Sequence, residues 1–183
     1  MKKQLKQLLL VNSFFLFAMN MFSPLYAVFI QKIDSAIYHV GGIWSFYILT
    51  VGILTLIIRN YENHQKYADY FLILGFICRL IGWTSYVFAT SLIHLYLIQI
   101  IMALGESFGT PSYNLIYSSF LTKGKYASDW GFNSALSSFV MAGAAFLGGI
   151  IVHNFGFNYL FYTMMGFSIV SIFFAISFRK SFS

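Results

Sequence analysis

The sequence predicts an all-α membrane protein with six transmembrane helices, and two observations lead to this fold class. Of its 183 residues, 59% are hydrophobic and only 9% are charged, whereas a water-soluble domain carries about a quarter charged residues. The apolar residues also fall into six continuous runs, and each run is close to the roughly 20 residues that a helix needs to cross the bilayer. Continuous runs favour helices over a membrane barrel, whose strands alternate with period two.

We predict that one domain, residues 1–183, contains the six spans. Their expected limits are residues 8–30, 40–58, 67–89, 92–121, 130–152 and 159–178. The first run is too long for a signal-peptide core, and no small-x-small cleavage site follows it, so we interpret it as a retained span. The single cysteine, Cys78, lies within an apolar segment and is expected to be a small core residue.

The distribution of basic residues between the spans predicts the orientation. Only Lys32 falls on one side of the predicted membrane, so by the positive-inside rule the other side is cytoplasmic. That side carries Lys2, Lys3, Lys6, Arg59, Lys66, Lys123, Lys125, Arg179 and Lys180. Both termini are then cytoplasmic, in a multi-pass protein of the plasma (inner) membrane. The net charge of +6 is explained by this topology, and no nucleic-acid partner is expected.

Two charged residues, Arg79 and Glu106, fall deep inside predicted spans. Each costs about 2.5 to 3.5 kcal/mol in hydrocarbon unless it is paired or faces water. Counted from the outer ends of their spans at about 1.5 Å per residue, they lie roughly 15 and 21 Å deep, and an arginine side chain can bridge that difference. We predict an intramembrane ion pair. It is either a brace between two helices, or Glu106 faces a water-filled cavity as a protonatable or substrate-contacting residue.

The remaining polar residues in the spans follow helical spacing. On the fourth span, Gln99, Glu106, Thr110, Tyr113 and Tyr117 form one stripe. Asn20 on the first span and Asn133 on the fifth are further polar positions, and ordinary hydrogen bonding between helices is the simpler interpretation of such residues. The third and sixth spans are almost entirely apolar apart from Arg79, and we expect them to be lipid-facing supports.

Small residues and prolines predict local geometry. Ala144 with Gly148, and Ala145 with Gly149, repeat the small-xxx-small pattern that lets two membrane helices approach closely. Pro24 in the first span and Pro111 in the fourth each lack a backbone N–H group and are predicted helix bends.

The two halves of the chain echo each other faintly. Pro24-x-Tyr26 corresponds to Pro111-x-Tyr113, and "YFLILGF" in the third span corresponds to "YTMMGF" in the sixth. Because each unit has three spans, the second would cross the membrane inverted relative to the first. We therefore predict a 3+3 inverted repeat, an arrangement typical of transporters.

On these residues the chain resembles one six-helix half, the N-terminal half, of the major facilitator superfamily. "QIIMALGESFGTPSYNLIYSSFLTKGKYASDWG" looks like the family's glycine-rich fourth helix and the basic loop after it, and "NMFSPLYAVFI" is similar to its first helix. "AGAAFLGGIIVHNFGFNYLFY" resembles its fifth helix, although alanines stand where that family has a Gly-Pro pair. The family usually has twelve spans. Two parallel copies of a six-helix unit can reproduce that arrangement.

The resemblance implies a secondary transporter of a small solute that works by alternating access, as a homodimer or paired with a second six-helix half. It also implies a substrate cavity lined by the first, second, fourth and fifth spans. The candidates for that cavity are Asn20, Gln99, Glu106, Tyr113 and Asn133. A non-transporting membrane subunit, or a fragment of a twelve-helix carrier, is the alternative.

A catalytic function finds little support in the sequence. "GESFG" matches the serine-hydrolase pattern around Ser107, but that motif requires a turn between a strand and a helix, and every histidine lies at or near a span end. No catalytic residue, metal or cofactor is expected, because His, Cys, Asp and Glu do not cluster at ligand spacing within the spans.

Overall fold

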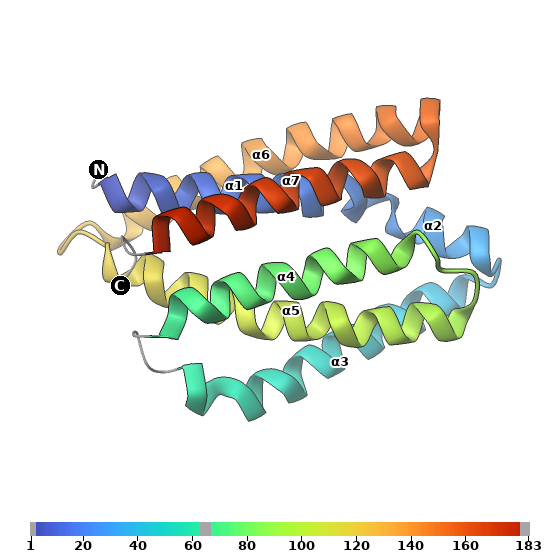
Figure 1. Ribbon diagram of the computed structural model, residues 1–183, viewed down its shortest axis with the longest axis horizontal. Coiled ribbons are helices and arrows are strands. Elements are labelled where there is room, and N and C mark those ends of the chain that lie inside the picture. The colour runs from blue at the N-terminus through green and yellow to red at the C-terminus, as the bar shows by residue number, and fades with distance from the viewer. Residues whose placement is uncertain (1–2, 63–66, 180–183) are drawn as a thin grey trace.

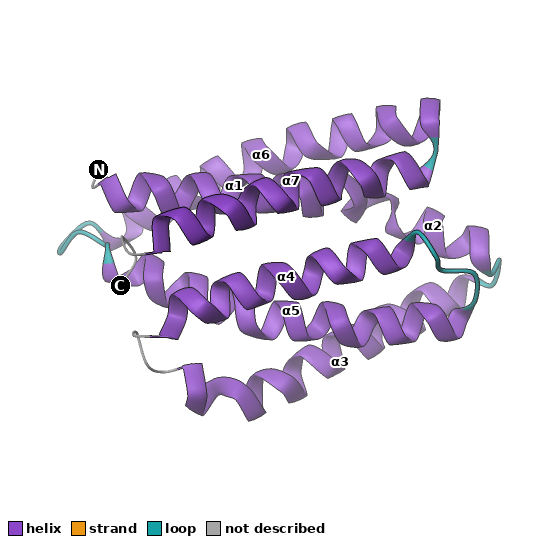
Figure 2. Ribbon diagram, in the orientation of Figure 1, coloured by secondary structure: helices purple, strands orange, loops and turns teal. Residues whose placement is uncertain are grey.

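The computed structural model describes residues 3–62 and 67–179, and all of its regular structure is helical (Figure 2). Six helical segments in these ranges are long and apolar enough to cross a membrane. The prediction of an all-α chain with six helices able to cross a membrane is therefore confirmed. Of the basic residues used to predict the orientation, Lys2, Lys66 and Lys180 lie outside the described ranges.

The first span is interrupted at Pro24. It consists of α1 (Lys3–Phe22), a 3₁₀ turn η1 (Ser23–Leu25) and α2 (Tyr26–Ile33). Pro24 lies in the first turn of η1, where its missing N–H group costs no hydrogen bond. The α-helix resumes after the turn, and the whole segment from Lys3 to Ile33 is longer at both ends than the predicted 8–30.

The other five spans are single helices: α3 (Ile37–Glu62), α4 (Ala68–Tyr86), α5 (Leu92–Ser119), α6 (Tyr126–Phe155) and α7 (Phe157–Phe178). The largest differences from the predicted limits among these five are in α3 and α6. α3 begins three residues earlier and ends four residues later, and α6 begins four residues earlier and ends three residues later. Only Gly156 separates α6 from α7, and its φ of +84° lies in the region that favours glycine.

The helices form a row in which neighbours in space are seldom neighbours in sequence. α3 packs on α5, α5 on α4, α4 on α7, α7 on α1, and α1 on α6. Figure 1 shows this order, with α6 and α3 at opposite edges and with α1 and α5 on either side of α7 and α4. The elements at the edges, α3 and α6, have the fewest buried residues of the six spans.

The third and sixth spans, which we expected to be lipid-facing supports, expose large apolar side chains on one face but also bury the other face in the bundle. α4 and α7 lie in the middle of the row and bury far more of their residues than α3 or α6 do. Large α4 and α7 side chains such as Phe76, Trp83 and Phe161 are at most 2% exposed. A helix that is apolar all round fits lipid and protein interior equally well, so hydropathy cannot distinguish the two environments.

The chain ends lie together at one end of the bundle. The N-terminus, the C-terminus, the end of α3, the start of α4 and the α5–α6 connection are all at that end in Figure 1. The described basic residues at the helix termini there are Lys3, Lys6, Arg59, Lys123, Lys125 and Arg179. Lys32, at the end of α2, lies at the opposite end. We call these the basic end and the opposite end.

Candidate functional site

An ion pair between α4 and α5 is the centre of the candidate site. Arg79 Nη2 donates to Glu106 Oε2, and their side chains are 5% and 26% exposed. Thr110 Oγ1, one turn further along α5, donates to Glu106 Oε1 at 2.5 Å. The guanidinium of Arg79 also lies over the ring of Phe15 on α1, with 4.7 Å between Cζ and the ring centroid. Arg79 thus joins three helices while its charge is balanced by Glu106.

Glycines allow α4 and α5 to approach closely enough for this pair. A Cβ atom added to Gly75 would lie 2.6 Å from the Cα of Gly109, and one added to Gly105 would lie 2.5 Å from Cγ of Arg79. Real Cβ atoms do not approach other atoms so closely, so larger residues at Gly75 or Gly105 would force the helices or Arg79 to move. The aliphatic part of Arg79 therefore lies directly over Gly105.

The ion pair lines a cavity of about 230 Å³, here called the inner cavity. Its walls come from α1, α4, α5 and α6, and they include Asn12, Thr110, Tyr113, Asn133 and Ser137 besides the pair. The hydroxyl of Tyr113 donates to Oδ1 of Asn133 at 2.6 Å, which links α5 to α6. This cavity brings together three residues predicted for a substrate site: Glu106, Tyr113 and Asn133.

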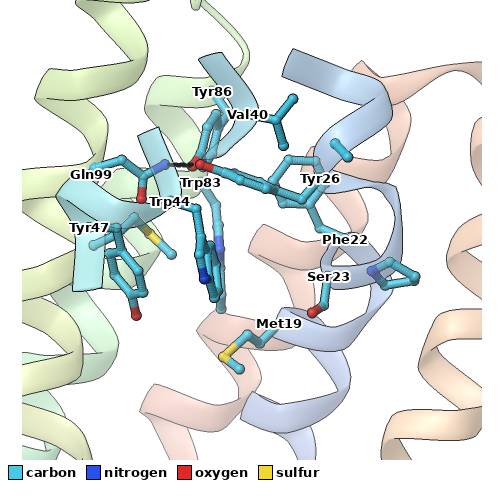
Figure 3. Close-up of a pocket in the computed structure, with 13 residues that line it drawn as sticks. Met19, Phe22, Ser23, Tyr26, Val40, Trp44, Tyr47, Trp83, Tyr86 and Gln99 are labelled. Atoms are coloured by element: carbon cyan, nitrogen blue, oxygen red, sulfur yellow. Dashed lines mark hydrogen bonds between the residues drawn. The ribbon is translucent and has the colours of Figure 1, made fainter. Parts of the chain in front are cut away.

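A second cavity, of about 400 Å³, lies nearer the opposite end and is here called the outer cavity. Six aromatic residues from α1, α2, α3 and α4 line it: Phe22, Tyr26, Trp44, Tyr47, Trp83 and Tyr86. Gln99 on α5 donates its side-chain amide to the hydroxyls of Tyr26, at 2.6 Å, and Tyr86, at 2.8 Å (Figure 3). Gln99, also predicted for a substrate site, thus belongs to a different cavity from Glu106.

The two cavities are neighbours. Met19 on α1 belongs to the walls of both. Tyr47, in the wall of the outer cavity, interacts electrostatically with Glu106, in the wall of the inner one. The aromatic cavity and the ion pair therefore lie close to each other, with the flexible side chain of Met19 in the wall between them.

Several predicted positions lie apart from both cavities. Asn20 is 4% exposed and donates to the carbonyl of Leu16 within α1, so its amide is satisfied by its own helix. Pro111 lies inside α5, which stays α-helical from Leu92 to Ser119. Ser107, the serine of the hydrolase-like pattern, is fully buried, accepts from Thr55 and donates to the carbonyl of Val51, both on α3.

The two small-residue pairs of α6 differ in their surroundings. Ala144 and Gly148 are buried, and a Cβ atom added to Gly148 would collide with the backbone of Met21 on α1. Gly149 has no atom within 4 Å of such a Cβ position, and Ala145 is only partly buried. The close approach of α6 to α1 is therefore made through Ala144 and Gly148.

Sequence reasoning missed the aromatic residues of the outer cavity. Tyr26 and Tyr86 lie near span ends, where tyrosine is common in any membrane protein because the interface suits it. Their spacing from Gln99 in sequence gives no sign of a shared hydrogen-bond network. The clearest available signal was Gln99 itself, since a buried amide needs partners.

No protein-family model matches the chain, and no curated protein is significantly similar to it. Within residues 3–62 and 67–179, no group of three or more His, Cys, Asp or Glu residues is placed to hold a metal ion.

Proposed function

We propose that this chain is one six-helix half of a secondary membrane transporter, similar to the major facilitator superfamily, and that it acts as a parallel homodimer. The observation that carries the proposal is the Arg79–Glu106 pair in the wall of a cavity. Intramembrane charges are costly, and they commonly mark the path of a substrate or an ion. A helix brace alone would not require the polar residues Asn12, Asn133 and Ser137 around the same cavity.

The packing of the helices supports a 3+3 inverted repeat. Such a repeat would relate α1 to α5, α3 to α6 and α4 to α7. The contact of α3 with α5 then corresponds to the contact of α6 with α1. The contact of α4 with α5 likewise becomes that of α7 with α1, and the α4–α7 contact is unchanged. All of these contacts are present, as a pseudo-twofold axis in the membrane plane requires. α1 and α5 are equivalent in this scheme, and both line both cavities.

A partner bundle is part of the proposal because alternating access needs two bodies that move against each other. Both chain ends lie at the basic end, so two copies side by side can reproduce a twelve-span arrangement in parallel. α3 and α6 flank the row and expose large apolar side chains such as Leu49 and Phe139, which are 64% and 78% exposed. We place the partner against these helices. By the positive-inside rule the basic end is cytoplasmic, in the plasma (inner) membrane.

The oligomeric mass tests this proposal. Native mass spectrometry of the protein released from nanodiscs should give particles of two chains, and cross-links between copies should join cysteines placed at the same end. A stable, strictly one-chain particle would contradict the proposal, since one bundle offers no second body to rock against. Co-purification with a different six-helix protein would replace the homodimer by a heterodimer.

The second candidate is a non-transporting membrane subunit, favoured by the hydrogen bonds that already satisfy Asn20 and Ser107 internally. It differs from the transporter in lacking a hydrated path through the bundle. Reaction of cavity cysteines with water-soluble thiol reagents therefore separates the two functions.

A further inference from the structure

The outer cavity has the chemistry of a ligand site. Its volume of about 400 Å³ falls within the roughly 300 to 1,000 Å³ of small-molecule sites. Its lining is mostly apolar, and none of the described residues that line it is Lys, Arg, Asp or Glu. An anion would find no positively charged partner among these residues.

Three features of the walls favour a positive charge. Six aromatic side chains surround the cavity, and the face of an aromatic ring carries partial negative charge. Met19 and Met102 add polarisable sulfur atoms. The third feature is Gln99, which makes hydrogen bonds within the described residues only as a donor, through its NH₂ group.

The orientation of Gln99 leaves its carbonyl oxygen available. Figure 3 shows the NH₂ group directed at the hydroxyls of Tyr26 and Tyr86, while the oxygen points to the side of the cavity where Tyr47 and Trp44 lie. The polar atom that Gln99 itself presents to a ligand is therefore an acceptor.

We infer that the outer cavity binds a small organic cation, in which a quaternary ammonium group carries an apolar or aromatic substituent. Quaternary ammonium ions form no hydrogen bonds and are easily desolvated, which suits a cavity of aromatic rings. The inference rests on the proposed function, because it names the class of solute that the transporter would carry. Met19 then separates the bound cation from the inner cavity and the ion pair.

The molecule supplies its own reporter for this binding. Trp44 and Trp83 line the outer cavity, and the third tryptophan, Trp130, packs on Tyr117 near the basic end. Replacing Trp130 by Phe confines tryptophan fluorescence to the outer cavity. The probes are phenyltrimethylammonium and its uncharged isostere tert-butylbenzene, which match in shape and differ in charge. N-acetyltryptophanamide in protein-free micelles corrects for partitioning of each probe.

We expect phenyltrimethylammonium to change the fluorescence of the Trp130→Phe protein with an affinity about five- to thirtyfold above that of tert-butylbenzene. Trp44→Leu, at a side chain that is 51% exposed, should lower the affinity for the cation about fivefold and that for the isostere less than twofold. Trp83 remains as the reporter in that variant. Equal binding of the two probes would overturn the inference, and so would the absence of binding by the cation.

The outcome is separable from that of the proposed function. A one-chain particle would contradict the hypothesis of a paired transporter, and cation binding could still be measured in the same protein. Conversely, a dimer that binds no cation would keep the transporter and remove this solute class.

Discussion

Separating Arg79 from Glu106 should destabilise the bundle unequally, depending on which partner is removed. Glu106→Leu leaves a guanidinium that is 5% exposed and has no counter-charge. Removing one partner of a buried pair costs about 3 to 5 kcal/mol. Arg79→Leu leaves Glu106, whose side chain is 26% exposed and keeps the hydrogen bond from Thr110, so we expect a smaller cost of about 1 to 3 kcal/mol.

The double variant gives the sharper result. With both charges removed, no ion remains in the low-dielectric region, and apolar replacements of buried pairs are often close to neutral. We expect the double variant to lie within about 1 kcal/mol of the unmodified protein, so the two single losses should exceed the double loss by at least about 2 kcal/mol. Replacing Arg79 also removes its contact with Phe15, and this contact is lost in both the Arg79 single variant and the double variant.

Reversible unfolding in mixed micelles, with an increasing fraction of sodium dodecyl sulfate and tryptophan fluorescence as the signal, gives the four free energies. Glu106→Gln is the matched control, because it removes the charge and keeps an acceptor for Arg79; it should fall between Glu106→Leu and the unmodified protein. Losses of the two single variants that add to within about 0.5 kcal/mol would refute an energetic coupling between these side chains.

Two further predictions concern helix packing and the connection at the opposite end. Gly148→Val should destabilise the bundle by about 1 to 3 kcal/mol, because the new side chain meets the backbone of Met21. Gly149→Val has open space around it and should change the stability by less than about 0.5 kcal/mol. The same unfolding assay measures both variants, and equal effects would contradict the packing described. The hydrogen bond from the backbone N–H of Ala36 and, to a smaller extent, the hydrogen bond with His39 hold the pKa of Asp34 below its ordinary 3.8. The stabilisation from ionised Asp34 is therefore present above pH 3.8 and is lost as the pH falls through the lowered pKa. Asp34→Ala should therefore lower the melting temperature at pH 6, and its difference from the unmodified protein should shrink as the pH falls below 3.8 and through the lowered pKa. A difference that stays constant as the pH falls would show that ionisation plays no part.

Hydropathy was sufficient to predict the six helices, because only continuous apolar helices satisfy the backbone within a bilayer. It was less informative about their ends. α6 starts at Tyr126 because its first turn is held from elsewhere: Asp129 accepts the N–H of Thr122 at 2.8 Å through its carboxylate, and accepts the hydroxyl of Tyr117 at 2.5 Å through its carbonyl. These contacts cross the short connection between α5 and α6, and average hydropathy does not register individual hydrogen bonds.

The candidate site could be predicted only in part. A charge in an apolar span is conspicuous, and the depths of Arg79 and Glu106 along their helices were enough to propose a pair. Gln99 and Glu106 share a helical stripe, but the stripe extends through two cavities, since Met19 from α1 projects between them. Asn20 lines neither of the two cavities, and its amide donates to the carbonyl of Leu16 in its own helix.

The most direct test of the account is whether water reaches the inner cavity while the protein is in a membrane. With Cys78 replaced by serine, Ser137→Cys places a thiol in the wall of the inner cavity, and Phe173→Cys places one on α7 at a position that is 64% exposed and faces away from both cavities. A membrane-impermeant maleimide should label position 137 in membranes accessible from both sides and leave position 173 unlabelled. Labelling of position 173 as fast as position 137, or no labelling of position 137 from either side, would contradict a hydrated cavity around the Arg79–Glu106 pair.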